Sequence, residues 1–480
     1  MNAAVSFEIG QPQGPARIAV TGIYRRGSDH IGFIADVKRL SILPLAGFVP
    51  EIPLAGIDLT LDGRLTGALS LDGALSTVGF EVSAEDGRIE RPDVLSRALP
   101  VDTLEVKGAT QRDLKEVVID SFEVTSSGTS LEGSGRLVRS AAGAGLSAEL
   151  RAENVPAADL DLYWPPELGE KARKWVLENI TAGIAPHAEA TLEFAPGELE
   201  ERPVPEATVQ GRFVFQDVTV GYFKTLPPLE GVDGSATFTA RRMDIDVARG
   251  HVGNLEVSKG SAVITGMGIK GRDTTQLEVA AEIAGPIQEA LALIDHEPLG
   301  FASKIGIEPQ ATAGRTEVDL RIGVPLHKDL EPSEVRVQAK AQLHDAAISK
   351  LRDRFDVDGG ELELSVDRAS AALSGSARVD GVPLEIDWQE NLADDAALER
   401  SFHLQGDVPA DALARFGIEP PLPVQGSFGL GARVEETAGR RQVYLALDLE
   451  PLAFSLPWLA WQKARGQEGR LDAVLAIPEE

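Results

Sequence analysis

Apolar and polar residues alternate with a period of two along most of this 480-residue chain. The longest such run is Val335, Val337, Ala339, Ala341 and Leu343, with a polar residue at every position between them. A period of two places alternate side chains on opposite faces of a β-strand, whereas a helical face needs a period near 3.6. The alternation therefore predicts a mainly β protein whose sheet has one apolar and one polar face.

Turn signals separate the alternating runs and indicate how the strands are connected. Asp-Gly pairs occur at 62–63, 72–73, 86–87, 233–234 and 380–381, and this dipeptide favours tight hairpins between antiparallel strands. Helical signals are few, and the clearest covers 165–182, where apolar residues recur at helical spacing. The predicted fold is an elongated, curled antiparallel sheet that forms a repeating β-groove with short crossing helices.

Four similar segments along the chain indicate an internal repeat. Each starts with a β-branched residue, at Val37, Val155, Ile287 and Val408, so the spacings are 118, 132 and 121 residues. Each continues into a helix-like stretch, near 37–46, 157–182, 286–295 and 409–416. Units that bury a face only against their neighbours build solenoids. We therefore expect strands of a preceding repeat at 1–36, repeats at 37–154, 155–286 (with the helix at 165–182) and 287–407, and a truncated repeat at 408–480.

A curled sheet has a concave face, and the alternation predicts that this face is apolar. Ala339 and Ala341 are small, which favours an open groove because small side chains leave room for a ligand. A two-layer sandwich would give the same alternation, so the pattern alone does not separate a groove from a sealed core. The candidate groove-lining residues are Met243, Ile245, Val247, Val318, Leu320, Ile322, Val335, Val337, Ala339, Leu362 and Leu364.

The charge balance restricts the partners. The chain has 46 Lys and Arg against 75 Asp and Glu, a formal net charge of −29. Nucleic acid and anionic membrane surfaces both require a basic face, so we expect neither nucleic acid nor tight docking on such a membrane. No apolar run reaches the 18 residues of a membrane-spanning helix. Alternation starts at once at Val5, and the sequence stops abruptly at Glu480, so we expect both ends to be cut from a longer chain.

Signatures of catalysis and metal binding are missing from the sequence. There is no cysteine, which excludes disulfides, zinc–thiolate sites and cysteine nucleophiles. No two of the seven histidines have a spacing suited to a metal, and no nucleophile elbow, phosphate loop or dinucleotide fingerprint occurs. We therefore predict no enzymatic activity, no cofactor and no catalytic or metal-binding residues.

The second repeat carries a recognisable motif. It runs from Tyr163-Trp164-Pro165 through Gly169 to Trp175, Asn179 and Gly183. Together with the stretches 222–232, 263–267 and 298–304, it resembles YhdP-type members of the AsmA-like superfamily. The similarity is strongest over 150–335.

This resemblance implies a periplasmic protein of the Gram-negative cell envelope that is anchored in the inner membrane. Its long β-groove would bind phospholipid acyl chains and move phospholipid towards the outer membrane, with other envelope proteins as further partners. The resemblance also implies that the N-terminal anchor and the far C-terminal part lie outside this sequence.

Two alternatives remain open from the residues alone. One is a structural or adhesive β-solenoid of the cell envelope, which requires a filled interior. The other is a carbohydrate-active β-helix enzyme, which requires paired carboxylates in a cleft.

Overall fold

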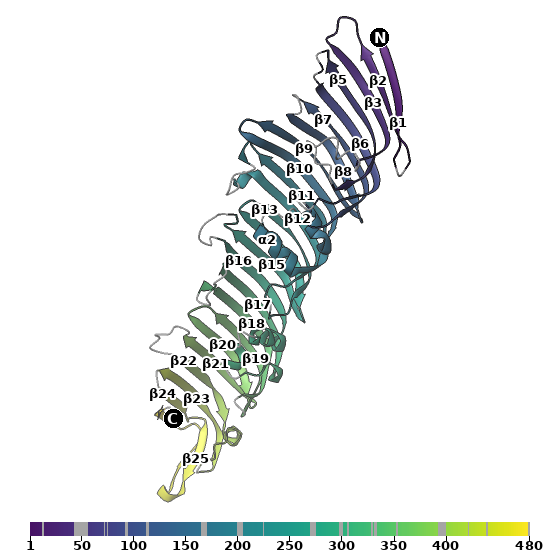
Figure 1. The fold of residues 1–480 in the computed structure, drawn as a ribbon. Helices are drawn as coiled ribbons and strands as arrows, with labels where there is room; N and C mark the ends of the chain where they lie inside the picture. Colours follow the sequence, from purple (N-terminus) through teal and green to yellow (C-terminus); the bar gives the residue numbers. More distant parts are fainter. Residues whose placement is uncertain are drawn as a thin grey trace. The chain divides into compact units, whose positions relative to one another are not determined.

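The computed structural model describes residues 1–480 except 12–13, 43–55, 72, 74, 92–94, 112–114, 165–169, 199–204, 224, 269–274, 297–300, 305–306, 328–329, 331–333, 352–353, 392–399, 421, 438–439 and 479–480. Strands make up 71% of the structure and helices 10%. Figure 1 shows the strands following one another along the sheet, with short helices beside it. The prediction of a mainly β fold, built on a curled antiparallel sheet with short helices, is confirmed.

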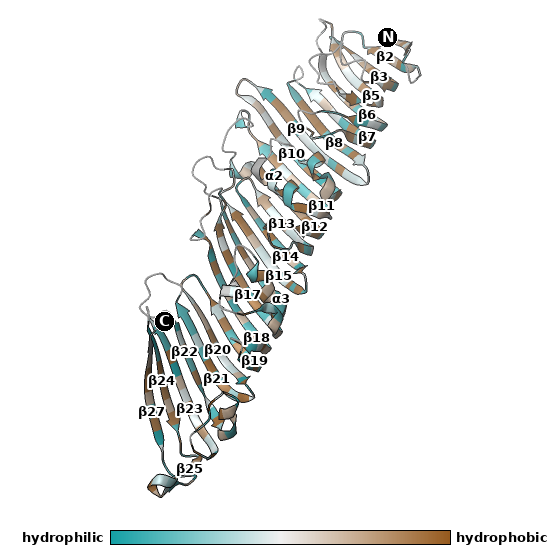
Figure 2. Cartoon of the chain, turned by 60° about the horizontal axis from the view of Figure 1, so that its bottom comes forward, coloured by the Kyte–Doolittle hydropathy of each residue, from teal (hydrophilic) through white to brown (hydrophobic). Residues whose placement is uncertain are grey.

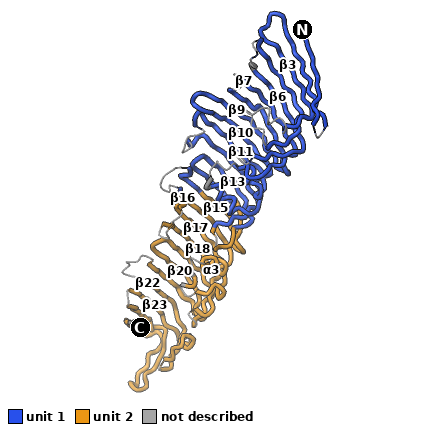
Figure 3. The backbone as a smooth tube through the Cα atoms, viewed as in Figure 1, with its two compact units in different colours: residues 1–222, 229–247, 263–275 blue, residues 223–228, 248–262, 276–480 orange. Residues whose placement is uncertain are grey.

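The chain divides into two compact units (Figure 3). Unit 1 comprises residues 1–222, 229–247 and 263–275, and unit 2 comprises residues 223–228, 248–262 and 276–480. The strands β14 (Arg242–Val252) and β15 (Leu255–Thr265) contribute residues to both units. The division into two units does not test the predicted repeats of about 120 residues. Their boundaries at 37, 155, 287 and 408 therefore stay a prediction.

Unit 1 is an open antiparallel sheet in which neighbours in sequence are also neighbours in space. The one interruption is β4, which pairs with β6, while β3 pairs with β5. Its strands are β1 (Asn2–Ile9), β2 (Ala16–Tyr24), β3 (His30–Ser41), β4 (Ile57–Asp58), β5 (Thr60–Ser70), β6 (Leu75–Ile89), β7 (Leu99–Gln111), β8 (Glu116–Ser126), β9 (Thr129–Ser140), β10 (Gly143–Pro156), β11 (Ile180–Phe194), β12 (Val209–Val220) and β13 (Leu229–Thr239).

Unit 2 repeats this arrangement. The strands from β16 to β24 pair in sequence order, β27 then pairs with β24, and β25 and β26 form a small separate hairpin that joins β23. Its strands are β16 (Gln276–Pro286), β17 (Thr312–Pro325), β18 (Arg336–Leu351), β19 (Phe355–Val366), β20 (Ser370–Val379), β21 (Val382–Asn391), β22 (Arg400–Pro409), β23 (Val424–Thr437), β24 (Arg440–Asp448), β25 (Leu452–Leu456), β26 (Trp461–Lys463) and β27 (Arg470–Pro478).

Three long connections contain the helices, and each begins where a strand ends at a proline. Pro156, Pro286 and Pro409 are the last residues of β10, β16 and β22, and each has extended φ and ψ angles. Proline lacks an amide N–H and cannot donate to the hydrogen-bond ladder, which fits the position of these three residues at strand ends. The helices that follow are η2 (Ala157–Asp159), α1 (Leu160–Tyr163), α2 (Glu170–Asn179), α3 (Ile287–Asp295), α4 (Phe301–Lys304), η5 (Pro309–Ala311) and η7 (Ala410–Ala414). Two further 3₁₀ turns lie elsewhere, η4 (Glu206–Thr208) and η8 (Pro457–Leu459).

The sequence predicted three of the four helical stretches in the right place. Within the predicted stretch 157–182, helices at 157–163 and 170–179 are confirmed, but residues 180–182 are wrong because they begin strand β11, and 165–169 lie outside the described residues. The helix at 287–295 is confirmed, and the stretch near 409–416 contains a 3₁₀ helix. The helix predicted from 37 is wrong as far as Ser41, because β3 continues through a bulge and pairs with β5 at Leu40 and Ser41. Most of the remainder of that stretch lies outside the described residues.

Two small clusters of buried side chains are found, one in each unit, while other buried apolar residues such as Val155, Val218 and Leu255 lie outside them. In unit 1, Ile42, Leu59, Ala84 and Val101 form one cluster. In unit 2, residues of β21 to β23, η7 and β25 form the other: Val382, Leu384, Val408, Ala410, Ala412, Phe428 and Leu452. The hydropathy colouring of Figure 2 shows apolar and polar residues alternating along the strands.

Candidate functional site

One face of the unit 2 sheet carries an apolar row that crosses ten paired strands without a break. Each residue lies directly opposite the next, because the antiparallel register keeps equivalent side chains on one face. From β16 to β27 the row is Ile283, Val318, Ala341, Leu364, Leu373, Trp388, Phe402, Val434, Val443 and Leu475. Such a row offers a continuous apolar strip perpendicular to the strands.

The structure brings most of the predicted lining residues of unit 2 onto this face. Val318, Leu320 and Ile322 of β17 lie opposite Ala341, Ala339 and Val337 of β18. Leu364 and Leu362 of β19 lie opposite Ala341 and Leu343. Val335 precedes β18 and so has no partner in the described ladder.

The predicted residues Met243, Ile245 and Val247 lie on β14, within unit 1. All three are half-buried and alternate with Asp244 and Asp246. Whether any of the predicted residues touches a ligand stays a prediction.

Unit 1 has an equivalent row across twelve strands. Three residues of this row are glycines, and two of them lie directly opposite a phenylalanine: Gly133 opposite Phe122 and Gly211 opposite Phe238. Outside the row, Gly67 lies opposite Phe33 in the same way. A Cβ added at Gly133 would lie 2.8 Å from the Phe122 ring, so the ring covers the bare backbone. From β1 to β13 the row is Phe7, Ile18, Val37, Gly63, Val82, Val106, Phe122, Gly133, Leu150, Ala190, Gly211 and Phe238.

These apolar rows are open to solvent to a degree that a sealed core is not. Among the described residues of the unit 2 row, Ala341 alone is buried, at 8% exposure, and Leu475 at the other end is 50% exposed. Val337, one of the predicted lining residues, is 37% exposed. The apolar faces are therefore accessible surfaces.

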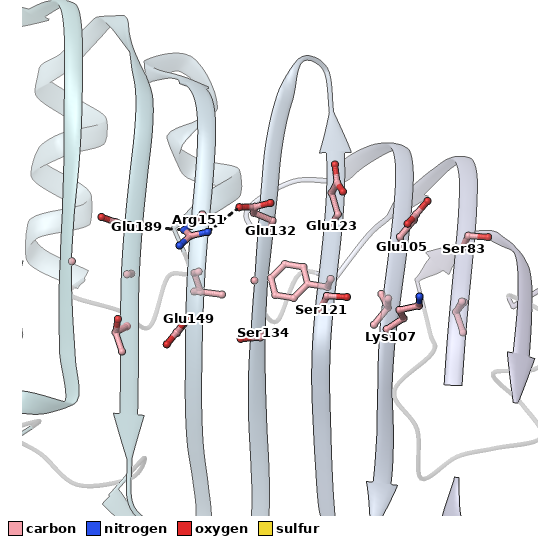
Figure 4. Close-up of a pocket in the computed structure, with 18 of the residues that line it drawn as sticks. Ser83, Glu105, Lys107, Ser121, Glu123, Glu132, Ser134, Glu149, Arg151 and Glu189 are labelled. Atoms are coloured by element: carbon pink, nitrogen blue, oxygen red, sulfur yellow. Dashed lines mark ion pairs between the residues drawn. The ribbon is translucent and has the colours of Figure 1, made fainter. Parts of the chain in front are cut away.

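The opposite, polar face of unit 1 is hollowed into a groove of about 1070 Å³. Figure 4 shows its side chains rising from successive strands, among them Lys107, Glu123, Glu132 and Arg151. Its charged lining residues are Asp36, Lys38, Asp62, Arg64, Glu81, Glu105, Lys107, Glu123, Glu132, Glu149, Arg151, Glu189, Arg212, Arg242 and Asp244.

Many of these groove charges neutralise one another across the strands. Arg64 pairs with Asp36 at 2.7 Å, and Arg151 lies 3.6 Å from Glu132. The hydrogen bond from Lys38 to Asp62, at 2.7 Å, holds the pKa of that carboxyl below its usual value. Such solvated ion pairs contribute little to stability.

The lining of this hollow is mixed, because Val82, Val106, Phe122 and Leu150 of the apolar row line it together with the charged side chains. The prediction that the concave face is apolar stays a prediction. A twisted sheet is saddle-shaped, so a hollow in one direction can form on either face. The alternation places each side chain on a face, but it does not say which face is hollow.

A comparison with known protein families agrees with this architecture. The family model described as YhdP protein matches residues 54–479. The chain belongs to the YhdP family. Neither the curated proteins nor the solved structures that were compared include a match. Membership of the YhdP family, together with an open curled β-sheet, fits a lipid-transport groove in the cell envelope.

Most YhdP signature residues lie in the helical connection between β10 and β11, where they hold the connection together. Trp164 follows α1, and its carbonyl accepts a hydrogen bond of 2.7 Å from Arg173 of α2. Asn179 ends α2, and its side-chain amide donates a hydrogen bond of 2.8 Å to the carbonyl of Trp175. Trp175 itself is 47% exposed. Tyr163 ends α1, while Pro165 and Gly169 lie outside the described residues. These contacts are structural, and sequence spacing alone did not assign them.

An ion-pair cluster that the sequence did not reveal ties this YhdP connection to the segment before β7. The guanidinium of Arg97 lies 2.5 Å from the carboxylate of Asp159 and 3.1 Å from that of Asp161. The Ser96 hydroxyl donates a hydrogen bond of 2.7 Å to the Asp161 carboxylate. Burial opposes ionisation of Asp161, but the hydrogen bonds from Arg97 and Ser96 outweigh it, so the pKa of Asp161 lies below its usual value near 3.8. The cluster joins residues more than 60 positions apart.

This cluster predicts an acid-sensitive contribution to the stability of unit 1. A carboxyl whose pKa is lower folded than unfolded stabilises the fold above the unfolded pKa and loses that effect as pH falls through the folded pKa. We expect Asp161→Asn to lower the free energy of unfolding by about 1–2 kcal/mol at pH 7. The difference from wild type should shrink below about pH 4. Urea unfolding from pH 7 to pH 3 measures it, and a difference independent of pH would contradict the assignment.

Within the part of the chain that the structure describes, no helix has the length and apolar character of a bilayer-spanning segment. No group of three or more His, Asp or Glu side chains suited to holding a metal ion occurs among the same residues.

Proposed function

We propose that this YhdP-family chain is a periplasmic lipid-binding groove that forms part of a bridge-like protein, held at the inner membrane. In this proposal the apolar face of the sheet binds phospholipid acyl chains and moves phospholipid between the inner and outer membranes. The observation that carries it is the pair of unbroken apolar rows, one in each unit, whose side chains are half-buried rather than sealed.

Physical chemistry supports this use of the apolar rows. A lipid that crosses water must shield its acyl chains, at a cost of about 0.8 kcal/mol per exposed CH₂ group. A continuous apolar strip removes that cost at every position, and it needs no chemical step. Because neighbouring positions along the row are chemically alike, a chain can slide from one strand to the next without a large barrier.

The solenoid alternative needs a filled interior, and the described residues do not favour one. The row residues of unit 2 run from 8% exposure at Ala341 to 50% at Leu475, so this row is not sealed. An adhesive or structural role would not require an apolar face open to solvent.

One feature of the structure favours the alternative of a carbohydrate-active enzyme. Glu105 and Glu123 lie directly opposite each other in the polar groove. A glycosidase general acid, however, is kept protonated by an apolar environment, and both side chains are exposed. Glycan turnover that Glu123→Gln abolishes would establish this alternative in place of ours.

Photo-crosslinking in cells tests the proposal at adjacent positions on opposite faces. A crosslinking amino acid at position 320 faces the apolar row, and one at position 319 faces the polar side of the same strand, because side chains alternate. We expect phospholipid adducts at 320 and at least tenfold fewer at 319, a ratio that corresponds to about 1.4 kcal/mol. Equal labelling, or none at 320, would rule out this face as the lipid path.

A further inference from the structure

The apolar face of unit 2 changes character along the four strands β21 to β24. On β21 the residues of this face are Val382, Leu384 and Ile386, which are 1%, 4% and 8% exposed, and then the half-buried Trp388 and Glu390. β22 follows the same gradient, from Val408 at 1% exposure to Phe402 and Arg400. The face is thus closed by the buried cluster at one end and becomes charged at the other.

Four charged side chains form a single row at this charged end. Glu390, Arg400, Glu436 and Arg441 lie directly opposite one another on β21, β22, β23 and β24. The guanidinium of Arg400 lies 2.8 Å from the carboxylate of Glu390 and 3.3 Å from that of Glu436. The guanidinium of Arg441 donates a hydrogen bond of 2.6 Å to the Glu436 carboxylate. Their side chains are 20% to 41% exposed, so the row is neither sealed nor fully solvated. We call it the charged rim.

The charged rim runs beside the apolar row. Each rim residue is two positions along its strand from a row residue: Trp388, Phe402, Val434 or Val443. Two residues of strand span roughly 7 Å. A molecule with an apolar chain on the row therefore has its polar end within reach of the rim.

We infer that the charged rim binds the phosphate-bearing headgroup of a glycerophospholipid whose acyl chains lie on the adjacent row. This inference rests on the proposed function and adds where the headgroup sits. Each guanidinium presents a planar fork of donors that matches phosphate geometry. The two carboxylates hold the guanidiniums in place before the lipid arrives, and they accept from the ammonium of a zwitterionic headgroup.

The alternation of charge explains why the site suits a lipid in transit. The row has two cations and two anions, so it is neutral overall and holds a phosphate less tightly than two unpaired arginines would. A bound phosphate exchanges with the glutamate partners rather than entering an empty cationic site. Release therefore restores the ion pairs, and it leaves no buried charge unpaired.

The test measures headgroup preference in the double variant Arg400→Gln/Arg441→Gln. Native mass spectrometry of the whole chain with phosphatidic acid and with diacylglycerol of identical acyl chains gives a preference ratio. We expect wild type to favour the phospholipid and the double variant to lose at least tenfold of that preference, about 1.4 kcal/mol, while diacylglycerol binding is retained. Arg400→Lys/Arg441→Lys should recover part of it, because lysine keeps the charge without the fork.

Arg433→Gln is the matched control, since Arg433 lies on the polar face of β23, over the Tyr444 ring at 4.8 Å. It should leave the preference unchanged. An unchanged preference in the double variant, or an equal loss in the control, overturns the inference. Glycerol 3-phosphate that competes as well as the phospholipid would show a free-phosphate site and overturns it too. A wild-type chain that binds neither lipid would instead overturn the proposed function.

Discussion

We expect Leu320→Asp to lower lipid binding at this position of the unit 2 apolar face more than tenfold while the fold persists. Leu320 is half-buried in β17 between Ala281 and Ala339. A carboxylate there displaces at least two methylenes of a bound chain, about 1.6 kcal/mol, which is more than tenfold in affinity. Water reaches an open face, so the charge is not fully desolvated, and the fold loses only about 1–1.5 kcal/mol of apolar burial.

Val382→Asp provides the contrast for this variant. Val382 lies on the same apolar face of unit 2, but it is 1% exposed and belongs to the buried cluster. A charge at that site has no partner and no water, and should lower the free energy of unfolding by about 4 kcal/mol or more. Thermal melting and native mass spectrometry together separate the two variants. Leu320→Asp should keep a melting temperature close to that of wild type but lose bound lipid, whereas Val382→Asp should have a strongly lowered melting temperature. If both collapse, Leu320 is an ordinary core residue and our functional interpretation of this face is wrong.

The second large effect is expected at Gly183, a signature residue at the start of β11. Its φ of 109° lies in the region that side chains disfavour. A Cβ there would lie 2.6 Å from the Cα of Val218 and 2.9 Å from the carbonyl oxygen of Asp217. Backbone atoms of the paired strand cannot move aside without breaking the ladder. We expect Gly183→Ala to destabilise unit 1 by about 3 kcal/mol or more, the sum of strain and clash.

Gly128→Ala measures the cost of backbone strain alone, without a steric clash. Gly128 has a φ of 89°, and nothing lies within 4 Å of its added Cβ. This variant should cost only about 1 kcal/mol. Urea unfolding of both variants measures the difference. Equal costs would mean that the contact with Val218 relaxes and that Gly183 is required for its backbone angles alone.

The sequence alone was enough to predict the fold class and the face of the sheet on which each residue lies. The alternation at Val318, Leu320 and Ile322 requires a strand with these three side chains on one side, whatever the strand packs against. The helix expected from Val37 failed for the opposite reason, since pairing with β5 overrode the local pattern.

Only the tertiary structure decided which residues meet across strands and which surfaces stay open. Glu390, Arg400, Glu436 and Arg441 are spread over 52 positions of sequence, and their row exists because the register of four strands aligns them. The hollow on the charged face of unit 1 depends on the twist of the sheet, which period-two alternation does not encode. Alternation sets the side of the sheet on which each residue lies, whereas register, curvature and burial depend on the contacts between strands.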